Sequence, residues 1–387
     1  MKLERLRLLD FRNYRDLDLA FGESWILLVG ANAQGKTNIL EAIALVCSGH
    51  SPRRAPEVEM IRWGQDRARV VASITTDLRG DLEIETTLTG TGREIKVNGA
   101  ARRVADLIGL VGLVTFTVDD LDIVKRDPSA RRRFLDTELG ALSRSYYWNL
   151  VRYRRVVEQR NRLLKAARES SRRPPELESW DAQLAQFGAI VVEKRAGFVR
   201  AVACEGDIAH RKLTSGQGGL ELHYRPALGD EQAWQRITSA AEDAEDLRRR
   251  IGERLARALT EGRTRELELG MTQHGPHRDD FDIVGGGVDL HRFGSQGEQR
   301  TAAIALRLGL MRVVAETVGE SPLLLLDDVL SELDVERRAG LFEALGAAGQ
   351  TVVTATDIES IPAGVRAAAK AYHVVNGAVM PPAWSTR

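Results

Sequence analysis

The stretch Gly30-Ala31-Asn32-Ala33-Gln34-Gly35-Lys36-Thr37 has two glycines, a lysine and a hydroxyl residue at the spacing of a phosphate-binding loop (P-loop). The glycines permit backbone angles that point successive N–H groups at phosphate oxygens. Lys36 supplies a point charge for the β- and γ-phosphates of ATP, and the Thr37 hydroxyl suits Mg²⁺. The sequence therefore predicts an ATP and Mg²⁺ site at Gly30 to Thr37, with Asn38 as a further nucleotide contact, Lys36 as a catalytic residue and Thr37 as a metal ligand.

The residues on both sides of the loop give it the context that a P-loop needs. Trp25 to Val29 is a short apolar run that predicts a buried strand. After the loop, apolar residues recur at helix spacing, at Ile39, Leu40, Ile43 and Val46. The start of this helix adds a positive dipole end to the site. The alternative is a chance glycine-rich turn, which the strand and the helix together disfavour.

A second acidic motif follows a buried strand near the other end of the chain, in Leu323-Leu324-Leu325-Leu326-Asp327-Asp328. Such a strand delivers two carboxylates at its C-terminal end. We expect Asp327 to bind Mg²⁺, directly or through water, and Asp328 to orient or deprotonate the attacking water. The alternative is a helix cap, but one cap does not need two acids.

Between these motifs lies Phe293-Gly294-Ser295-Gln296-Gly297-Glu298-Gln299-Arg300, which opens a long helix. A turn of this kind holds phosphate through backbone amides and a hydroxyl. Turns before helices often contain Ser and Gly, so the order of the three motifs carries the argument. The run resembles the signature of ABC ATPases, in which two heads sandwich two nucleotides. The resemblance implies nucleotide contacts for Ser295, Gly297, Glu298 and Gln299, made to the ATP of the partner head.

The pattern of elements along the chain predicts an α/β fold whose ATPase head is assembled from both chain ends. Strands and one early helix occupy residues 1–125, long charged helices 126–264, and a returning α/β pattern 265–387. We therefore predict an ABC-type P-loop head in two parts with an inserted helical arm. Among the elements expected in the C-terminal part are strands at Glu266 to Met271 and Phe281 to Val284.

Several blocks resemble the RecF family of bacterial recombination mediators, in order over nearly the whole chain. They include Phe11-Arg12-Asn13-Tyr14, Arg131-Arg132-Arg133-Phe134-Leu135-Asp136, Gly275-Pro276-His277-Arg278-Asp279-Asp280 and Asp327-Asp328-Val329-Leu330-Ser331-Glu332-Leu333-Asp334. The last of these resembles the loop that crosses the dimer interface in ABC ATPases, and it is equally compatible with a turn that caps the next helix. Phe116 to Leu121 has no Gln for a Q-loop, and Thr354 to Asp357 no His for a switch.

The resemblance implies an ATP-dependent double-stranded DNA-binding protein of recombinational repair, replication restart and the SOS response. ATP would drive homodimerisation around DNA, and slow, DNA-stimulated hydrolysis would release it, as in a switch rather than a metabolic enzyme. The family helps to load RecA at SSB-coated single-strand gaps, with RecR as a partner and RecO in the pathway. The alternatives are a Rad50/SMC-like structural ATPase, which the short arm disfavours, and an ABC ATPase subunit without a DNA role.

Local charge supports a nucleic-acid partner although the net charge is zero. From Lys125 to Arg173 there are 15 Lys and Arg against 5 Asp and Glu, with Tyr146, Tyr147, Trp148 and Tyr153 interleaved. Positive charge beside phosphates releases counterions and gives sequence-independent affinity. The alternative is a solvated helix face with aromatics buried beneath it.

The remaining composition excludes other classes of protein. Two cysteines, Cys47 and Cys204, cannot form a disulfide framework, and the low number suits a reducing cytosol. No signal peptide is visible, and Leu323 to Leu326 is too short to span a bilayer, so we expect a cytoplasmic protein without a membrane partner. His274 and His277 lie close to acids, but without a third well-placed ligand we favour a structural or interface role over a metal site.

Overall fold

The computed structural model describes residues 1–53, 55–170, 175–230, 232–346 and 349–381, which form two compact units. The first unit comprises Met1–Leu121, Ile208–Gly216 and Ala303–Arg387, and the second comprises Asp122–Asp207 and Gln217–Ala302. The first unit thus contains both ends of the chain. Its fold is the predicted ABC-type head. The boundaries at 125/126 and 264/265 stay a prediction, and the second unit continues to Ala302 within helix α11 (Gln296–Val318).

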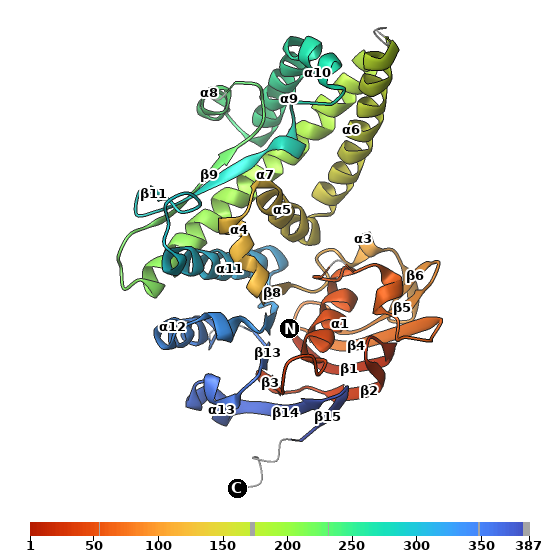
Figure 1. Cartoon of the computed structure of the whole chain (residues 1–387), viewed down its shortest axis with the longest axis vertical. Coiled ribbons are helices and arrows are strands. Elements are labelled where there is room, and N and C mark those ends of the chain that lie inside the picture. The colour runs from red at the N-terminus through yellow and green to blue at the C-terminus, as the bar shows by residue number, and fades with distance from the viewer. Residues whose placement is uncertain (54, 171–174, 231, 347–348, 382–387) are drawn as a thin grey trace. The chain divides into compact units, whose positions relative to one another are not determined.

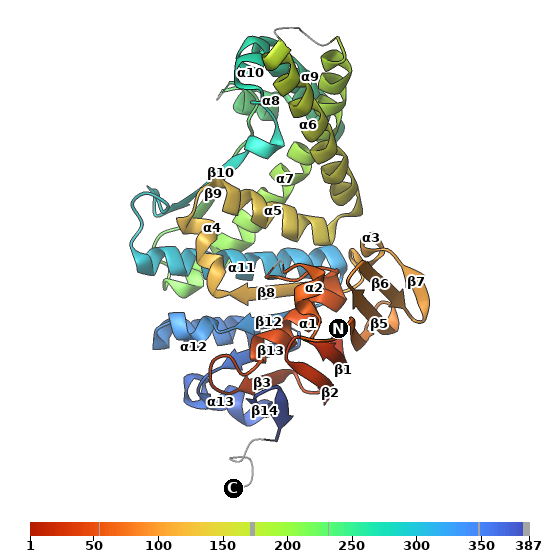
Figure 2. The same ribbon diagram turned by 45° about the vertical axis from the view of Figure 1, so that its right-hand side comes forward.

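A six-stranded sheet carries the nucleotide motifs of the first unit. Five parallel strands lie in the order β14, β3, β13, β12, β8, and β15 pairs antiparallel with β14. Their bounds are β3 Trp25–Val29, β8 Leu113–Thr117, β12 Leu323–Asp327, β13 Thr351–Ala355, β14 Ala369–Val375 and β15 Ala378–Met380. Figures 1 and 2 show that this sheet contains strands from both chain ends: β3 is red and β8 orange, whereas β12, β13 and β14 are blue. The pairing of β3 with β13 places the P-loop beside the carboxyl end of β12, because parallel strands end at one edge.

The first unit also contains an antiparallel sheet in the order β2, β1, β4, β5, β6, β7. The bounds are β1 Lys2–Phe11, β2 Tyr14–Ala20, β4 Arg67–Thr76, β5 Gly80–Thr89, β6 Gly92–Val97 and β7 Ala100–Arg102. Along β1, Leu3, Leu6 and Leu8 are buried, so this face forms part of the core. Helix α1 (Lys36–Ser48) packs on it. Further helices of this unit are α2 Glu57–Met60, α3 Val104–Leu107, α12 Val335–Gly346 and α13 Ala363–Ala368.

The second unit is mainly helical, as the sequence predicts. Its helices are α4 Leu121–Lys125, α5 Pro128–Leu142, α6 Arg144–Ser170, α7 Leu177–Leu213, α8 Ala233–Ala240, α9 Ala244–Glu261 and α10 Arg263–Leu269, with α4, α7 and α11 each continuing into the first unit. Both views show α6, α9 and α10 grouped together (Figures 1 and 2). A small sheet joins β9 (Leu220–Arg225), β10 (Asp280–Gly285) and β11 (Val288–Asp289).

The structure corrects one expected element and adds others. The strand expected at Glu266 to Met271 is wrong, because Glu266 to Leu269 belong to helix α10 and Gly270 is its C-cap. Its alternation of Glu and Leu imitates a half-buried strand, but Glu266 is fully buried and pairs with Arg160 of α6. Helix α5 lies in the stretch expected to be helical, but its bounds were not predicted, although Pro128 at its first turn and the capping Asp127 are the usual start signals. In the described parts of the chain, no helix has the length and apolar character needed to cross a membrane.

Candidate nucleotide site

The P-loop links β3 to α1 and is closely surrounded by other backbone. A Cβ atom at Gly30 would lie 2.3 Å from the carbonyl oxygen of Val374 in β14. Gly35 has a φ of +112°, a conformation that strains residues with side chains. The first backbone bonds of α1 run from the N–H groups of Asn38 and Ile39 to Gly35, at 3.0 and 3.3 Å. The N–H groups that precede them have no acceptor within the helix, and such groups at a helix start bind an anion well.

Lys36 lies over the loop that contains it. Its Nζ donates to the carbonyl oxygens of Gly30 at 2.6 Å and Ala31 at 2.9 Å, and the residue is buried. Burial lowers the pKa of Lys36, while the negative charges of Asp328 and Asp327 act in the opposite direction. The ammonium group therefore bonds to the loop itself and is attracted by the acidic motif, and its contact with phosphates stays a prediction.

Asp327 joins the acidic motif to the P-loop. Its Oδ1 accepts hydrogen bonds from the Thr37 hydroxyl at 2.8 Å and from the Thr354 hydroxyl at 3.1 Å. Burial raises the pKa of Asp327, and both hydroxyls and the charge of Arg53 oppose this rise. The two predicted metal residues, Thr37 and Asp327, are thus in direct contact. A hydroxyl and a carboxylate are oxygen donors of the kind that Mg²⁺ prefers, so the donor set fits this ion.

Asp328 adopts a left-handed backbone conformation, with a φ of +55°. Its N–H donates to the Thr354 hydroxyl at 2.9 Å, so one threonine side chain contacts both acidic residues. Non-glycine residues in this conformation are strained and often lie at functional sites. Sequence analysis did not identify Thr354 as a site residue. Thr354 is almost fully buried in β13, which also contains the buried Thr351, so no local pattern distinguishes it as a site residue.

The walls of the P-loop come from segments that sequence analysis did not assign to the site. In the β1–β2 turn, Asn13 Nδ2 donates to Gln34 O at 3.2 Å, and the Tyr14 hydroxyl to Gly35 O at 3.1 Å. In the β14–β15 turn, the N–H of Asn376 donates to Gln34 Oε1 at 2.7 Å. Asn38 accepts from Arg53 Nη1 at 3.2 Å. These contacts fix the loop before any ligand binds.

The signature run belongs to the second unit and starts α11 with a reciprocal cap. The Ser295 hydroxyl and N–H both donate to Glu298 Oε2, at 2.7 and 2.8 Å, and the Glu298 N–H donates back at 3.3 Å. These bonds lower the pKa of Glu298. Gln299 is buried, and its side chain donates to Leu290 O at 2.7 Å. Ser295 and Glu298 are thus available at the surface, whereas the Gln299 amide supports the turn from inside.

Comparisons with known proteins agree with this arrangement of motifs. The family model described as RecF/RecN/SMC N terminal domain matches residues 2–378. The DNA replication and repair protein RecF of Halalkalibacterium halodurans is 36% identical over 380 residues, covering 98% of this chain and 99% of that protein. The RecF of Symbiobacterium thermophilum is 40% identical over 375 residues, with 93% of each chain covered. This chain belongs to the RecF family.

Solved structures support the same assignment. The structure of the recombination mediator protein RecF-ATPrS in the RecFOR pathway has a TM-score of 0.87 at 30% identity, and covers 99% of this chain and 98% of that one. The corresponding RecF-ATP structure has a TM-score of 0.86 at 30% identity, covering 98% and 97%. An SMC head bound to the C-winged helix domain of ScpA has a TM-score of 0.55 at 16% identity, a likeness that concerns the fold alone.

The most specific RecF-family blocks of the second unit form a buried polar network. Arg195 is almost fully buried and donates to Asp136 at 2.6 Å and to Asp279 at 3.1 Å. Arg131 pairs with Asp280 at 2.6 Å. His277 contacts the Tyr153 hydroxyl through Nδ1 at 2.6 Å. The Arg-Arg-x-Phe-Leu-Asp and Gly-Pro-His-Arg-Asp-Asp blocks of this RecF-family chain therefore hold the second unit together, and His277 makes a structural contact within it.

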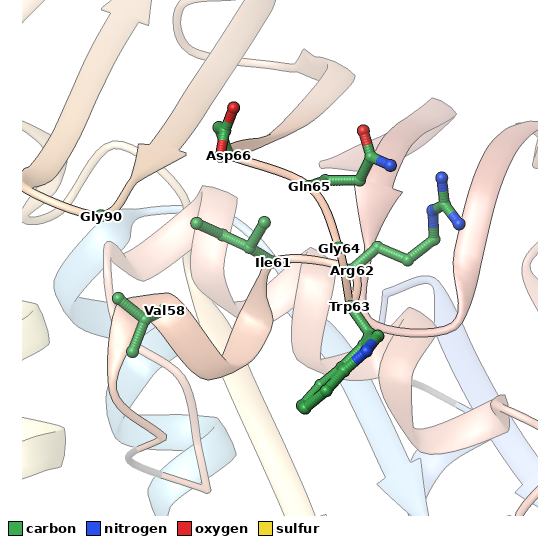
Figure 3. Close-up of a pocket in the computed structure, with 8 residues that line it drawn as sticks. All are labelled: Val58, Ile61, Arg62, Trp63, Gly64, Gln65, Asp66 and Gly90. Atoms are coloured by element: carbon green, nitrogen blue, oxygen red, sulfur yellow. The ribbon is translucent and has the colours of Figure 1, made fainter.

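A shallow cavity of about 360 Å³ lies in the first unit and contains none of the predicted site residues. Figure 3 shows Trp63 pointing out of the loop that carries it, and this side chain is 96% exposed. The lining residues are Val58, Ile61, Arg62, Trp63, Gly64, Gln65, Asp66 and Gly90. The loop is tied to the end of β1, because Ile61 forms a β-bridge with Phe11 and Arg62 pairs with Asp10 at 2.6 Å.

Proposed function

We propose that this chain is an ATP-dependent double-stranded DNA-binding protein of recombinational repair and replication restart. ATP drives two heads together around DNA, and slow hydrolysis releases it. The observation that carries the proposal is the contact between Thr37 and Asp327, which joins the two halves of a P-loop ATPase site. The similar RecF structure with ATP supports the choice of nucleotide.

The proposed site assigns a task to each residue. Backbone N–H groups from Gly30 to Thr37 cradle the phosphates, and Asn38 supports the loop from the first turn of α1. Lys36 leaves the carbonyl oxygens that it now contacts and donates to the β- and γ-phosphates. Thr37 and Asp327 hold Mg²⁺, which neutralises negative charge on the phosphates when it is bound. Asp328 orients the attacking water and accepts its proton.

Dimerisation through the signature completes the proposed cycle. Ser295, Gly297 and Glu298 contact the nucleotide held by the partner head, with Gln299 supporting their turn. Large exposed apolar side chains lie next to the motifs: Phe293 is 74% exposed two residues before Ser295, and Val335 is 77% exposed directly after Asp334. An interface that covers them gains hydrophobic free energy in addition to the nucleotide contacts. Ser331 to Asp334 would then lie in this interface.

The proposed DNA contact is one face of α6. Arg144, Trp148, Arg152, Arg155 and Arg162 recur at helix spacing, and all are exposed. Other cations of the basic stretch are structural: Arg160 is fully buried between Asp181 and Glu266. Tyr146 and Tyr153 are also buried, so Trp148 is the aromatic side chain most open to a ligand. The cationic face would neutralise phosphates without reading sequence.

The wider role follows from the relatives. A similar protein is described as a recombination mediator of the RecFOR pathway. We propose by analogy that this chain acts in the cytoplasm, with RecR and RecO, to load RecA at SSB-coated single-strand gaps, as part of the SOS response. Hydrolysis would be weak and stimulated by DNA. The proposed domains are a head formed by residues 1–125 and 265–387 and an arm formed by 126–264.

The deciding experiment measures the affinity for duplex DNA with ATP, with ADP and without nucleotide. We expect binding at least about tenfold tighter with ATP, since only ATP completes the interface of two heads. Equal affinity in all three states would contradict the ATP-dependent clamp, and no DNA binding would favour an ABC ATPase subunit without a DNA role. The double variant Arg152→Glu and Arg155→Glu should lose this affinity. The double variant Arg257→Glu and Arg265→Glu, at exposed positions of α9 and α10, makes the same change in net charge and serves as the control.

A further inference from the structure

Glu41 is the one acidic residue in α1, and it is buried one helical turn after Thr37. Its carboxylate accepts two hydrogen bonds from Arg12, each of 2.8 Å, and one of 2.5 Å from the Ser51 hydroxyl. A buried carboxylate is costly unless it is paired and hydrogen-bonded. Both carboxylate oxygens of Glu41 accept hydrogen bonds, so its negative charge is compensated by residues from two segments outside α1.

Arg12 connects Glu41 to the β1–β2 turn. Its backbone has a φ of +52°, its N–H donates to Met60 O at 2.8 Å, and its Nη1 donates to Glu59 O at 2.8 Å. A non-glycine residue keeps this conformation only when its surroundings hold it there. The bonds to Glu41 and to the end of α2 supply that constraint, so the turn has one defined position against α1.

The residues next to Arg12 and Ser51 meet at the P-loop. Asn38 donates to Asn13 Oδ1 at 2.8 Å and accepts from Arg53 at 3.2 Å. Asn13 and Tyr14 bind the carbonyl oxygens of Gln34 and Gly35. The packing is close, because a Cβ atom at Gly35 would lie 2.5 Å from Asn13 Nδ2. Any displacement of the turn therefore displaces the phosphate cradle.

We propose that Glu41 is a positioning residue of the nucleotide site, which anchors Arg12 and Ser51 and thereby fixes two of the three segments that surround the P-loop. The inference rests on the proposed ATP binding. Glu41 touches no reacting atom. Its contribution is to keep the cradle in its binding geometry before ATP arrives, so that less conformational freedom is lost on binding.

The test compares Glu41→Gln with Glu85→Gln in the full-length chain. Glu85 pairs with Arg69 through two hydrogen bonds of 2.8 Å on the antiparallel sheet, so it is a geometrically matched control. We expect Glu41→Gln to raise the KM for ATP and the Kd of a fluorescent ATP analogue about tenfold, with kcat within about twofold, because binding geometry changes and the reacting groups do not. Glu85→Gln should leave these constants unchanged at a similar thermal stability.

A double-mutant cycle shows whether Glu41 acts through Arg12. Arg12→Ala and Glu41→Ala should each weaken ATP binding. The double variant that combines them should bind ATP no more weakly than the weaker of the two single variants. Additive losses would overturn the proposed connection. Ser51→Ala, which deletes one hydrogen bond, replaces Glu41→Gln if that variant does not fold, and should still raise the Kd.

The outcome distinguishes this inference from the proposed function. If the wild-type protein binds ATP and a folded Glu41→Gln or Ser51→Ala variant has the same KM and Kd for ATP, the positioning role of Glu41 is wrong and the proposed function stands. Wild-type protein that binds no ATP would overturn the proposed function as well.

Discussion

The hydroxyl of Thr37 lies 2.8 Å from Oδ1 of Asp327, a residue that follows it by 290 positions in the chain. The bond exists because β3 and β12 flank β13 in one parallel sheet, which brings their carboxyl ends to the same edge. Thr354, at the end of the strand between them, completes the contact. The proposed nucleotide site of this RecF-family chain therefore depends on the strand order of the head.

Lys36→Ala should weaken ATP binding about 10- to 100-fold, because the phosphates lose a charge-assisted hydrogen bond. Isothermal titration with ATP and Mg²⁺ measures the loss. Lys96→Ala, on β6 of the antiparallel sheet, is the control for removal of one lysine. Normal affinity in the Lys36 variant would show that this loop does not hold the phosphates.

Asp328→Asn should retain ATP binding and slow hydrolysis about 100-fold, because an amide can no longer accept the proton of the attacking water. Asp327 remains to hold the metal, so we expect the ATP-bound dimer to accumulate. Single-turnover hydrolysis and nucleotide affinity, measured in parallel, separate the two effects. The exposed Asp16→Asn on β2 is a suitable control. Unchanged turnover would assign the base to another residue.

Ser295→Arg should leave ATP binding to the monomer intact and block ATP-driven dimerisation. The substitution removes the hydroxyl that bonds to Glu298 and places a bulky cation where the partner head must approach. Light scattering with and without ATP measures the dimer, and Ser295→Thr, which keeps a hydroxyl, is the matched control. A variant that still dimerises would contradict the sandwich, whereas one that loses ATP affinity as a monomer would place Ser295 in the pocket of its own head.

The free energy of unfolding should fall as the pH drops from about 6.5 to about 4. In this range His277 is neutral in the folded chain but protonated in the unfolded chain. Burial is the main cause that lowers the pKa of His277 from 6.5 to about 4. The unfolded chain therefore takes up a proton below about pH 6.5 that the folded chain refuses until about pH 4. The stabilisation that the neutral His277 provides is therefore complete above about pH 6.5 and is lost between about pH 6.5 and about pH 4.

The expected loss assigned to His277 is about 2 kcal/mol between about pH 7.5 and about pH 5. Urea unfolding at both pH values measures it, and His277→Gln should lack this part of the dependence, because glutamine does not titrate. An identical pH dependence in both proteins would show that His277 is not the titrating group. The difference between the proteins is decisive, since other groups titrate equally in both.

The sequence determined the P-loop, the acidic strand and the signature because each depends on neighbouring residues with fixed local chemistry. The same holds for the apolar runs of β3 and β12 and for the long helices α6 and α7, whose patterns extend over many residues. The alternation of Glu and Leu from Glu266 led to the wrong prediction of a strand, since a short polar–apolar repeat is compatible with both a strand and a helix. Its buried bond to Arg160 stabilises the helical choice, and no local pattern shows that bond.

Only the tertiary structure decided which distant residues surround the site. Thr354, Asn13, Tyr14 and Asn376 reach the P-loop or Asp327 from three further segments, and Glu41 joins Arg12 to Ser51 beneath it. Single polar residues in strands and turns carry no signal of their partners, because hydrogen bonds between segments depend on strand order and register. The sequence therefore determined the chemistry of the proposed nucleotide site, and the folded chain decided what holds that site in place.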